Sequence, residues 1–133
     1  MMEKYFKTQN AIELTRAAHN TAYIFNEEVE DYANEIDNWH KAITEKWHEG
    51  TKADNAISAL CTELLNDRNA IRATEERLYA LATEAEFADF LTAAEILAEV
   101  SRLFTEARQA YDHAQRRSNL AHEIIRNAET FRN

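Results

Sequence analysis

Apolar residues recur every three or four positions along most of the chain, which is the spacing of a helix with one buried face. The clearest stretch alternates between the two spacings over seven positions: Ala22, Phe25, Val29, Tyr32, Ile36, Trp39 and Ile43. Alternation of this kind is typical of helices that pack as in a coiled coil. We therefore predict a first long helix over about residues 9–49.

Two further helices follow from the same spacing. The second, over about 54–86, has apolar residues at intervals of seven: Ile57, Leu64, Ile71, Leu78 and Ala85. Asp67 and Thr74 place polar groups near the middle of this stripe, where such groups set register at a cost in stability. The third helix, over about 89–131, keeps the three-four spacing from Ala93 to Ala128.

Turns are scarce, because the chain contains one glycine and no proline. These residues are the usual helix breakers, since glycine reaches positive φ at little cost and proline ends helices. Gly50 is expected to end the first helix, in the left-handed conformation common at that position. We place the second turn near residues 85–90. Asp89 is one possible N-cap there, and capping boxes that begin at Thr83 and Thr92 are the alternatives.

Together these elements predict an all-α fold, an elongated antiparallel bundle of three long helices with coiled-coil-like packing. It resembles a spectrin repeat in architecture only, because no sequence motif supports a family. Residues 1–133 are expected to form a single helical-bundle domain. Aligning the helices about the two turns predicts three layers: Trp39 with Leu64 and Tyr111, Tyr32 with Ile71 and Phe104, and Phe25 with Leu78 and Leu97.

This alignment leaves both outer helices longer than the second. Residues 1–18 and 121–133 would extend past it, either as continued helix or folded back. Apolar side chains on these ends need cover, and the candidates are Tyr5, Phe6, Ile124 and Phe131. Trp47, near one end of the bundle, is a further candidate anchor for a partner. We expect a homodimer or another protein to cover these residues.

The net charge is −9, and the segment 27–37 contributes strongly to it. It contains six acidic residues and no base: Glu27, Glu28, Glu30, Asp31, Glu35 and Asp37. An acidic helix face could contact a basic surface on a partner or imitate a phosphate backbone. It could also be a solvated face without a partner. The acidic balance argues against direct binding of nucleic acid, which needs a surface of lysine and arginine.

Few residues in the sequence support an enzymatic function. A single glycine cannot supply the phosphate-binding or nucleophile-elbow motifs. Cys61 with His113 is a possible nucleophile and base, but a lone cysteine on an apolar stripe is usually a packed core residue. Glu45 and His48 have the Glu-x-x-His spacing of a di-iron bundle without the other ligands that such a site needs. We assign no catalytic, cofactor-binding or metal-binding residue.

The lone cysteine excludes an internal disulfide, and no apolar run approaches the length of a membrane span. The first residues lack the apolar stretch of a signal peptide. These features predict a cytoplasmic protein that does not contact membranes. The expected function is a non-enzymatic protein–protein interaction module, an adaptor or regulator that acts through helix faces and apolar helix ends. One alternative is a small acidic inhibitor that mimics DNA, as phages and mobile elements encode, and a more remote one is a metal-binding bundle.

Overall fold

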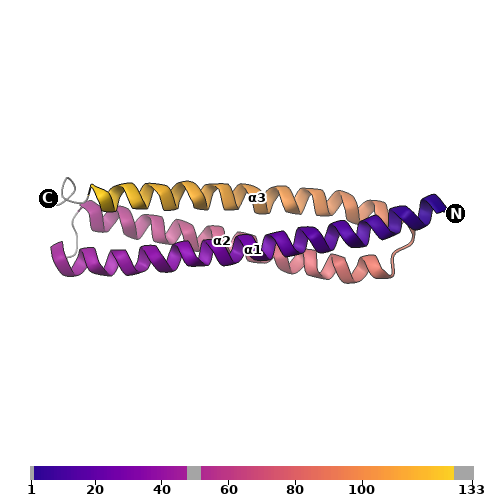
Figure 1. Ribbon diagram of the computed structural model, residues 1–133, viewed down its shortest axis with the longest axis horizontal. Helices are drawn as coiled ribbons and strands as arrows, with labels where there is room; N and C mark the ends of the chain where they lie inside the picture. Colours follow the sequence, from indigo (N-terminus) through magenta and orange to yellow (C-terminus); the bar gives the residue numbers. More distant parts are fainter. Residues whose placement is uncertain (1, 48–51, 128–133) are drawn as a thin grey trace.

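A computed structural model describes residues 2–47 and 52–127, which form three α-helices and contain no strand. These are α1 (Met2–Trp47), α2 (Lys52–Glu86) and α3 (Phe90–Arg126). The helices lie side by side in an elongated bundle, with α2 antiparallel to the other two (Figure 1). At a rise of about 1.5 Å per residue, α1 alone is roughly 70 Å long. The predicted fold class is confirmed.

Three of the six predicted helix ends agree with the structure: both ends of α2 and the start of α3. α1 begins at Met2 rather than near residue 9, because no breaker precedes it. The first turn falls between Trp47 and Lys52, where Gly50 was expected, although Gly50 itself lies outside the described residues. The predicted helix ends at 49 and 131 lie outside them as well.

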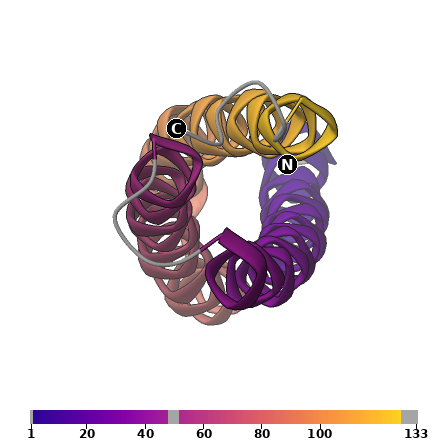
Figure 2. The same cartoon turned by 90° about the vertical axis from the view of Figure 1, so that its left-hand side faces the viewer.

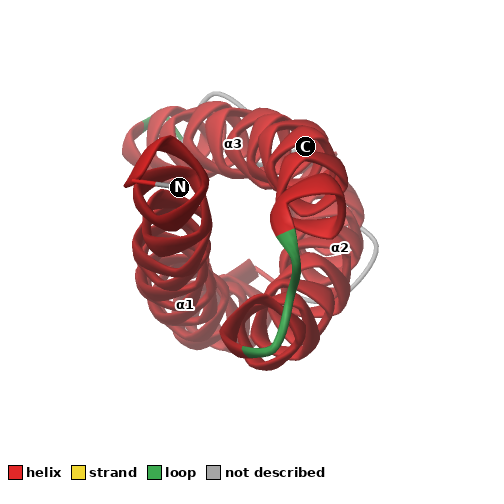
Figure 3. Ribbon diagram, turned by 90° about the vertical axis from the view of Figure 1, so that its right-hand side faces the viewer, coloured by secondary structure: helices red, strands yellow, loops and turns green. Residues whose placement is uncertain are grey.

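The second turn, seen at the near end of the bundle in Figure 3, follows the prediction closely. α2 ends at Glu86 as expected, and α3 begins at Phe90 with Asp89 as its N-cap. The Asp89 carboxylate accepts a hydrogen bond from the backbone N–H of Thr92 at 2.8 Å. This bond satisfies one of the backbone donors that the first helical turn leaves unpaired. It also lowers the pKa of Asp89.

The core runs along the axis around which the three helices wind (Figure 2). The α2 stripe is its centre, since Ile57, Leu64, Ile71 and Leu78 are completely buried. α1 contributes Val29 and Ile36, while α3 contributes mostly alanines towards the end with the first turn. Small residues on α3 opposite large ones on α2 fill the space between helices that lie close together.

The predicted layers are wrong in their alignment of α1 with α3. Phe25 stacks on Tyr111 at 4.3 Å between ring centroids and lies 6.3 Å from Phe104, whereas Leu97 was the expected neighbour. Trp39 makes an edge contact with His122 at 4.4 Å instead of meeting Tyr111. α3 is therefore displaced along α1 by about one to two heptads from the predicted register. A seven-residue repeat leaves nearly the same apolar face after such a slip, so it does not fix the alignment.

The displacement removes most of the expected overhang. Ala11, Thr15 and Ala18 are buried, so the segment 11–18 of α1 packs inside the bundle rather than beyond it. Ile124 is only 7% exposed and belongs to the core. The expectation that Ile124 lies uncovered is therefore wrong. Residues 2–18 and 121–126 continue their long helices and do not fold back.

Polar groups do occupy the middle of the α2 stripe, as its sequence predicts. Asp67 and Thr74 are both buried. Arg117 of α3 donates to both carboxylate oxygens of Asp67 at 2.5 Å and also lies 3.0 Å from Glu63. The hydrogen bond to Asp67 is the main reason that the pKa of Arg117 is raised. The hydroxyl of Thr74 donates a hydrogen bond to the backbone carbonyl of Ala70, within the same helix.

Candidate functional site

The acidic residues of the segment 27–37 spread around the outer half of α1. Glu27, Asp31 and Glu35 are spaced four residues apart, share one helix face and are exposed. Asp37 is exposed and pairs with Lys41 at 3.2 Å, one turn further along the helix. Glu30 is partly buried. The structure therefore leaves Glu27, Asp31 and Glu35 as the outward-facing part of the predicted acidic set.

Glu28 contributes to an internal contact between α1 and α3. It accepts a hydrogen bond from the hydroxyl of Tyr111, which also accepts one from the Gln115 amide at 3.1 Å. Burial raises the pKa of Tyr111, and the hydrogen bond to Glu28 raises it further. This tyrosine thus stays protonated and donates. Glu28 helps to hold α3 at its observed position along α1.

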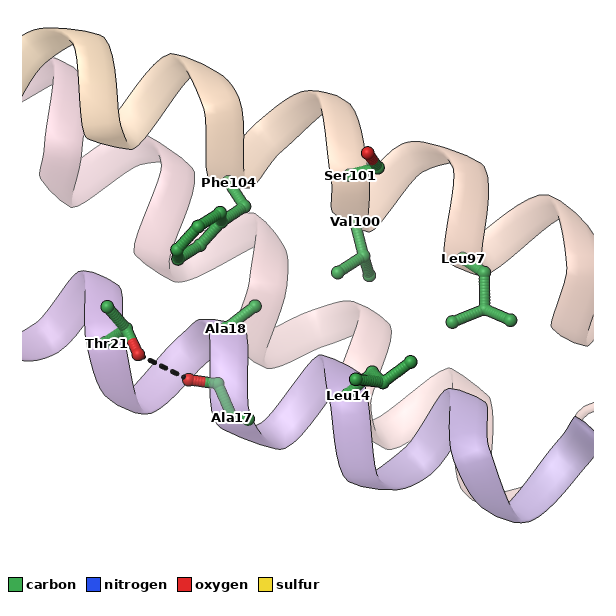
Figure 4. A pocket seen from close by; sticks show the side chains of 8 residues that line it. All are labelled: Leu14, Ala17, Ala18, Thr21, Leu97, Val100, Ser101 and Phe104. Atoms are coloured by element: carbon green, nitrogen blue, oxygen red, sulfur yellow. Dashed lines mark hydrogen bonds between the residues drawn. The ribbon is translucent and has the colours of Figure 1, made fainter.

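A hollow opens between α1 and α3 near the end of the bundle that contains the second turn. Its volume is about 330 Å³. Residues from these two helices line it, and none of them is charged: Leu14, Ala17, Ala18 and Thr21 from α1, and Leu97, Val100, Ser101 and Phe104 from α3. Figure 4 shows Leu14, Leu97 and Phe104 pointing into the space between the helices. We call this hollow the apolar groove.

The apolar groove is accessible to a partner. Leu14 is 55% exposed, although a leucine side chain is more stable when it is buried. Ala17 and Ser101 are small, so the helix backbones on both sides can be approached closely. Thr21 donates its hydroxyl to the carbonyl of Ala17 at 2.9 Å, which leaves no unpaired donor on that wall (Figure 4).

The junction of α1 and α3 is hollowed again towards the other end of the bundle. One polar hollow of about 240 Å³ has Tyr32 and Glu35 on its α1 side and Ser118 and His122 among its α3 residues. A neighbouring hollow is lined by Trp39, beside the ring of His122. The same junction is thus apolar at one end and carries carboxylate and hydroxyl groups further along.

A single stripe of α1 connects these regions. It consists of residues spaced alternately three and four apart: Leu14, Ala17, Thr21, Ile24, Glu28, Asp31 and Glu35. We call it the border stripe, because it lies on the α3 side of the outer face of α1. Its first four residues carry no charge, and Ile24 among them is 52% exposed. Its last three residues are all acidic.

Cys61 lacks the environment of a nucleophile. Burial raises the pKa of its thiol, and the negative charge of Asp37 adds to the effect. A reactive cysteine needs the opposite, a lowered pKa near positive charge. Cys61 packs against the core, and His113 is exposed on α3.

Histidines in α1 make polar contacts with α2. His40 lies 2.5 Å from a carboxylate oxygen of Asp54 and 3.1 Å from the hydroxyl of Ser58. His19 lies 3.7 Å from Glu75 and stacks obliquely on Tyr79. Among the residues that the structure describes, no three histidine, cysteine or acidic side chains are grouped so that they could hold a metal ion. The side chains of Glu45 and His48 lie outside that set.

Four of the predicted site residues have side chains outside the described part of the structure. The side chains of Tyr5, Phe6 and Trp47 and the whole of Phe131 lie outside the described residues. Conversely, the sequence reasoning missed the apolar groove. The available signal was a second apolar line, Leu14, Ala17, Thr21 and Ile24, beside the core line of the same helix. The line is short and contains two small residues. It therefore looks like ordinary helix surface unless the position of α3 beside it is known.

Comparison with protein-family models, curated proteins and solved structures finds no match to this chain. Within the described residues, no helix is long and apolar enough to cross a membrane.

Proposed function

We propose that this protein is a non-enzymatic protein–protein interaction module that binds its partner along the junction of α1 and α3. The observation that carries the proposal is the apolar groove, with the half-exposed Leu14 at its edge. Exposed apolar surface of this kind on a small protein is typical of an interaction site. A groove between two long helices is also a common recognition surface for a third helix.

The chemistry of Cys61 and Tyr111 supports binding rather than catalysis. The pKa of the Cys61 thiol is raised rather than lowered. Tyr111, whose pKa is raised as well, contacts Glu28 inside the bundle. Neither group is activated for nucleophilic or acid–base work near neutral pH. We place the protein in the cytoplasm, where its lone cysteine would remain a thiol.

A second candidate function is an acidic inhibitor that imitates DNA. The exposed line of Glu27, Asp31 and Glu35 favours it, because these carboxylates project from one rigid helix face. Such a face could occupy the phosphate-binding surface of an enzyme. Reversal of Glu27, Asp31 and Glu35 to lysine would abolish inhibition or binding under this alternative. Unchanged binding to a basic partner would exclude it.

The test of the main proposal is affinity capture from cells of the organism that encodes the protein. The bait is the full chain, compared with Ala17→Arg, which fills the apolar groove with a charged side chain. The matched control is Ala70→Arg, at an exposed alanine of α2 away from the groove. A specific partner that is captured by the full chain and the control, and lost with Ala17→Arg, supports the proposal. Capture that Ala17→Arg leaves unchanged contradicts it.

The same variant also tests whether the partner is a second copy of this chain. Sedimentation equilibrium of the purified chain at several concentrations measures self-association directly. A dimer that Ala17→Arg dissociates would make a second copy the partner at this groove. A monomer at all concentrations would leave a different protein as the partner.

A further inference from the structure

We infer that the partner presents an amphipathic helix with an apolar half and a basic half, which lies along the border stripe. This inference rests on the proposed function and names the class of partner. It requires a docking surface that is continuous, long enough for a helix, and different in charge at its two ends.

Continuity and length come from the border stripe itself. Its residues alternate three and four apart, so they form one line along a helix that packs in a coiled-coil-like bundle. From Leu14 to Glu35 the line is about 32 Å long, which corresponds to a partner helix of about six turns. α3 supplies the facing wall, with Leu97 and Phe104 in the apolar half and Ser118 in the acidic half.

The charge of the partner follows from the acidic half. Asp31 and Glu35 are exposed there, and Glu28 lies beside them in contact with Tyr111. The three-four spacing on the neighbouring face of α3 adds one base, Arg108, and one acid, Asp112, which balance each other. The excess of negative charge therefore comes from α1. A helix that covers this half with apolar groups would desolvate carboxylates without compensation, whereas lysine or arginine would pair with them.

A second copy of this chain fits the same surface poorly. If the two stripes ran antiparallel, the acidic half of each would lie on the apolar half of the other. If they ran parallel, Asp31 and Glu35 would face the same carboxylates of the other copy. The first arrangement buries unpaired charge and the second places like charges together, and both are unfavourable.

The test uses two synthetic 22-residue helical peptides and fluorescence anisotropy. Both carry leucine and alanine on the first four positions of one face. The basic peptide has lysine at the next three face positions, and the acidic peptide has glutamate there. We expect the basic peptide to bind the full chain at least about tenfold more tightly, with a preference that weakens as salt rises. Equal binding of the two peptides would overturn the inference.

Variants of the chain locate the effect. The double reversal Asp31→Lys with Glu35→Lys should reverse the preference, so that the acidic peptide binds better. Ala17→Arg should weaken both peptides, while Ala70→Arg should leave both unchanged. A basic-peptide preference that survives the double reversal would overturn the inference, because residues other than Asp31 and Glu35 would then cause the preference. Circular dichroism of each variant checks that the bundle is intact.

The outcomes separate this inference from the proposed function. Groove-dependent capture of a natural partner without a basic-peptide preference would overturn the inference and leave the interaction module standing. A groove-dependent homodimer would overturn it as well, since a second copy would then cover the stripe. Capture that does not depend on the groove would remove the proposed function first.

Discussion

The ion pair between Asp67 and Arg117 allows the packing of α2 against α3 to be tested quantitatively. Asp67 occupies a core position of α2, and its side chain is 9% exposed, whereas that of Arg117 is 30% exposed. Replacement of Asp67 by alanine removes both hydrogen bonds of the pair and leaves the guanidinium partly buried. The remaining carboxylate near Arg117 is Glu63, half of which is exposed to solvent.

The expected loss can be bounded. Removal of one partner from a fully buried ion pair costs about 3–5 kcal/mol. Solvent reaches part of Arg117, and Glu63 retains some of its interaction, so we expect Asp67→Ala to lose about 2 kcal/mol of unfolding free energy. The double variant Asp67→Leu with Arg117→Leu exchanges the pair for apolar packing. It should be at least as stable as the natural protein.

The assay is urea unfolding followed by circular dichroism, for Asp67→Ala, Arg117→Ala and the double alanine variant. We expect a coupling energy of about 1–2 kcal/mol between the two sites, as for directly interacting residues. A loss below about 0.5 kcal/mol for Asp67→Ala, with additive effects in the double variant, would refute the reasoning. The pair would then be a surface contact that contributes nothing measurable to the free energy of unfolding.

Three further results are expected. Asn26→Leu should raise the unfolding free energy by about 1 kcal/mol in the same urea assay, because the buried Oδ1 of Asn26 has no hydrogen-bond partner among the described residues; a loss of stability would show that this oxygen is satisfied. Cys61 should react slowly with a disulfide reagent at pH 7.5 until the protein is unfolded in urea, since burial raises the pKa of its thiol; equal rates in both states would contradict this. The pKa of Glu99 is lowered by its hydrogen bond with Arg77, so its stabilising contribution is complete above the pKa of the unfolded chain and is lost as the pH falls through the lower folded value. Glu99→Gln should therefore reduce the acid-induced fall in melting temperature, and an unchanged fall would exclude this pair as a cause.

The helices were predictable from sequence because burial imposes a period on each of them separately. The core stripe of α2, from Ile57 to Leu78, needs no knowledge of its neighbours to be recognised. Asp89 was among the possible N-caps for the same reason, since a cap acts within its own turn. Local rules thus account for where the helices lie and for which faces they bury.

The register between helices was not predictable in this way. Phe25 packs beside Phe104 and Tyr111 rather than Leu97. These three positions of α3 are seven residues apart, so the heptad spacing does not distinguish them. Contacts between distant polar residues distinguish one register from the next. Examples are His40 with Asp54 and Arg117 with Asp67. A single sequence does not identify such partners, because each helix offers several charged residues at similar spacing.

The candidate site was also predictable only in part, namely where it depends on α1 alone. Exposure of Glu27, Asp31 and Glu35 follows from their place opposite the core stripe of α1. The apolar groove does not follow from α1 alone, because its second wall is Leu97, Val100 and Phe104 of α3. Only the observed register brings that wall beside Leu14 and Thr21.

The most direct test of the central claim is site-specific photo-crosslinking in cells of the organism that encodes the protein. A photoreactive amino acid replaces Thr21, inside the apolar groove, or Ala70, on the exposed face of α2. We predict a discrete crosslinked product of larger mass from position 21 and none from position 70. Crosslinking at position 70 with none at position 21 would contradict the claim that the junction of α1 and α3 binds the partner.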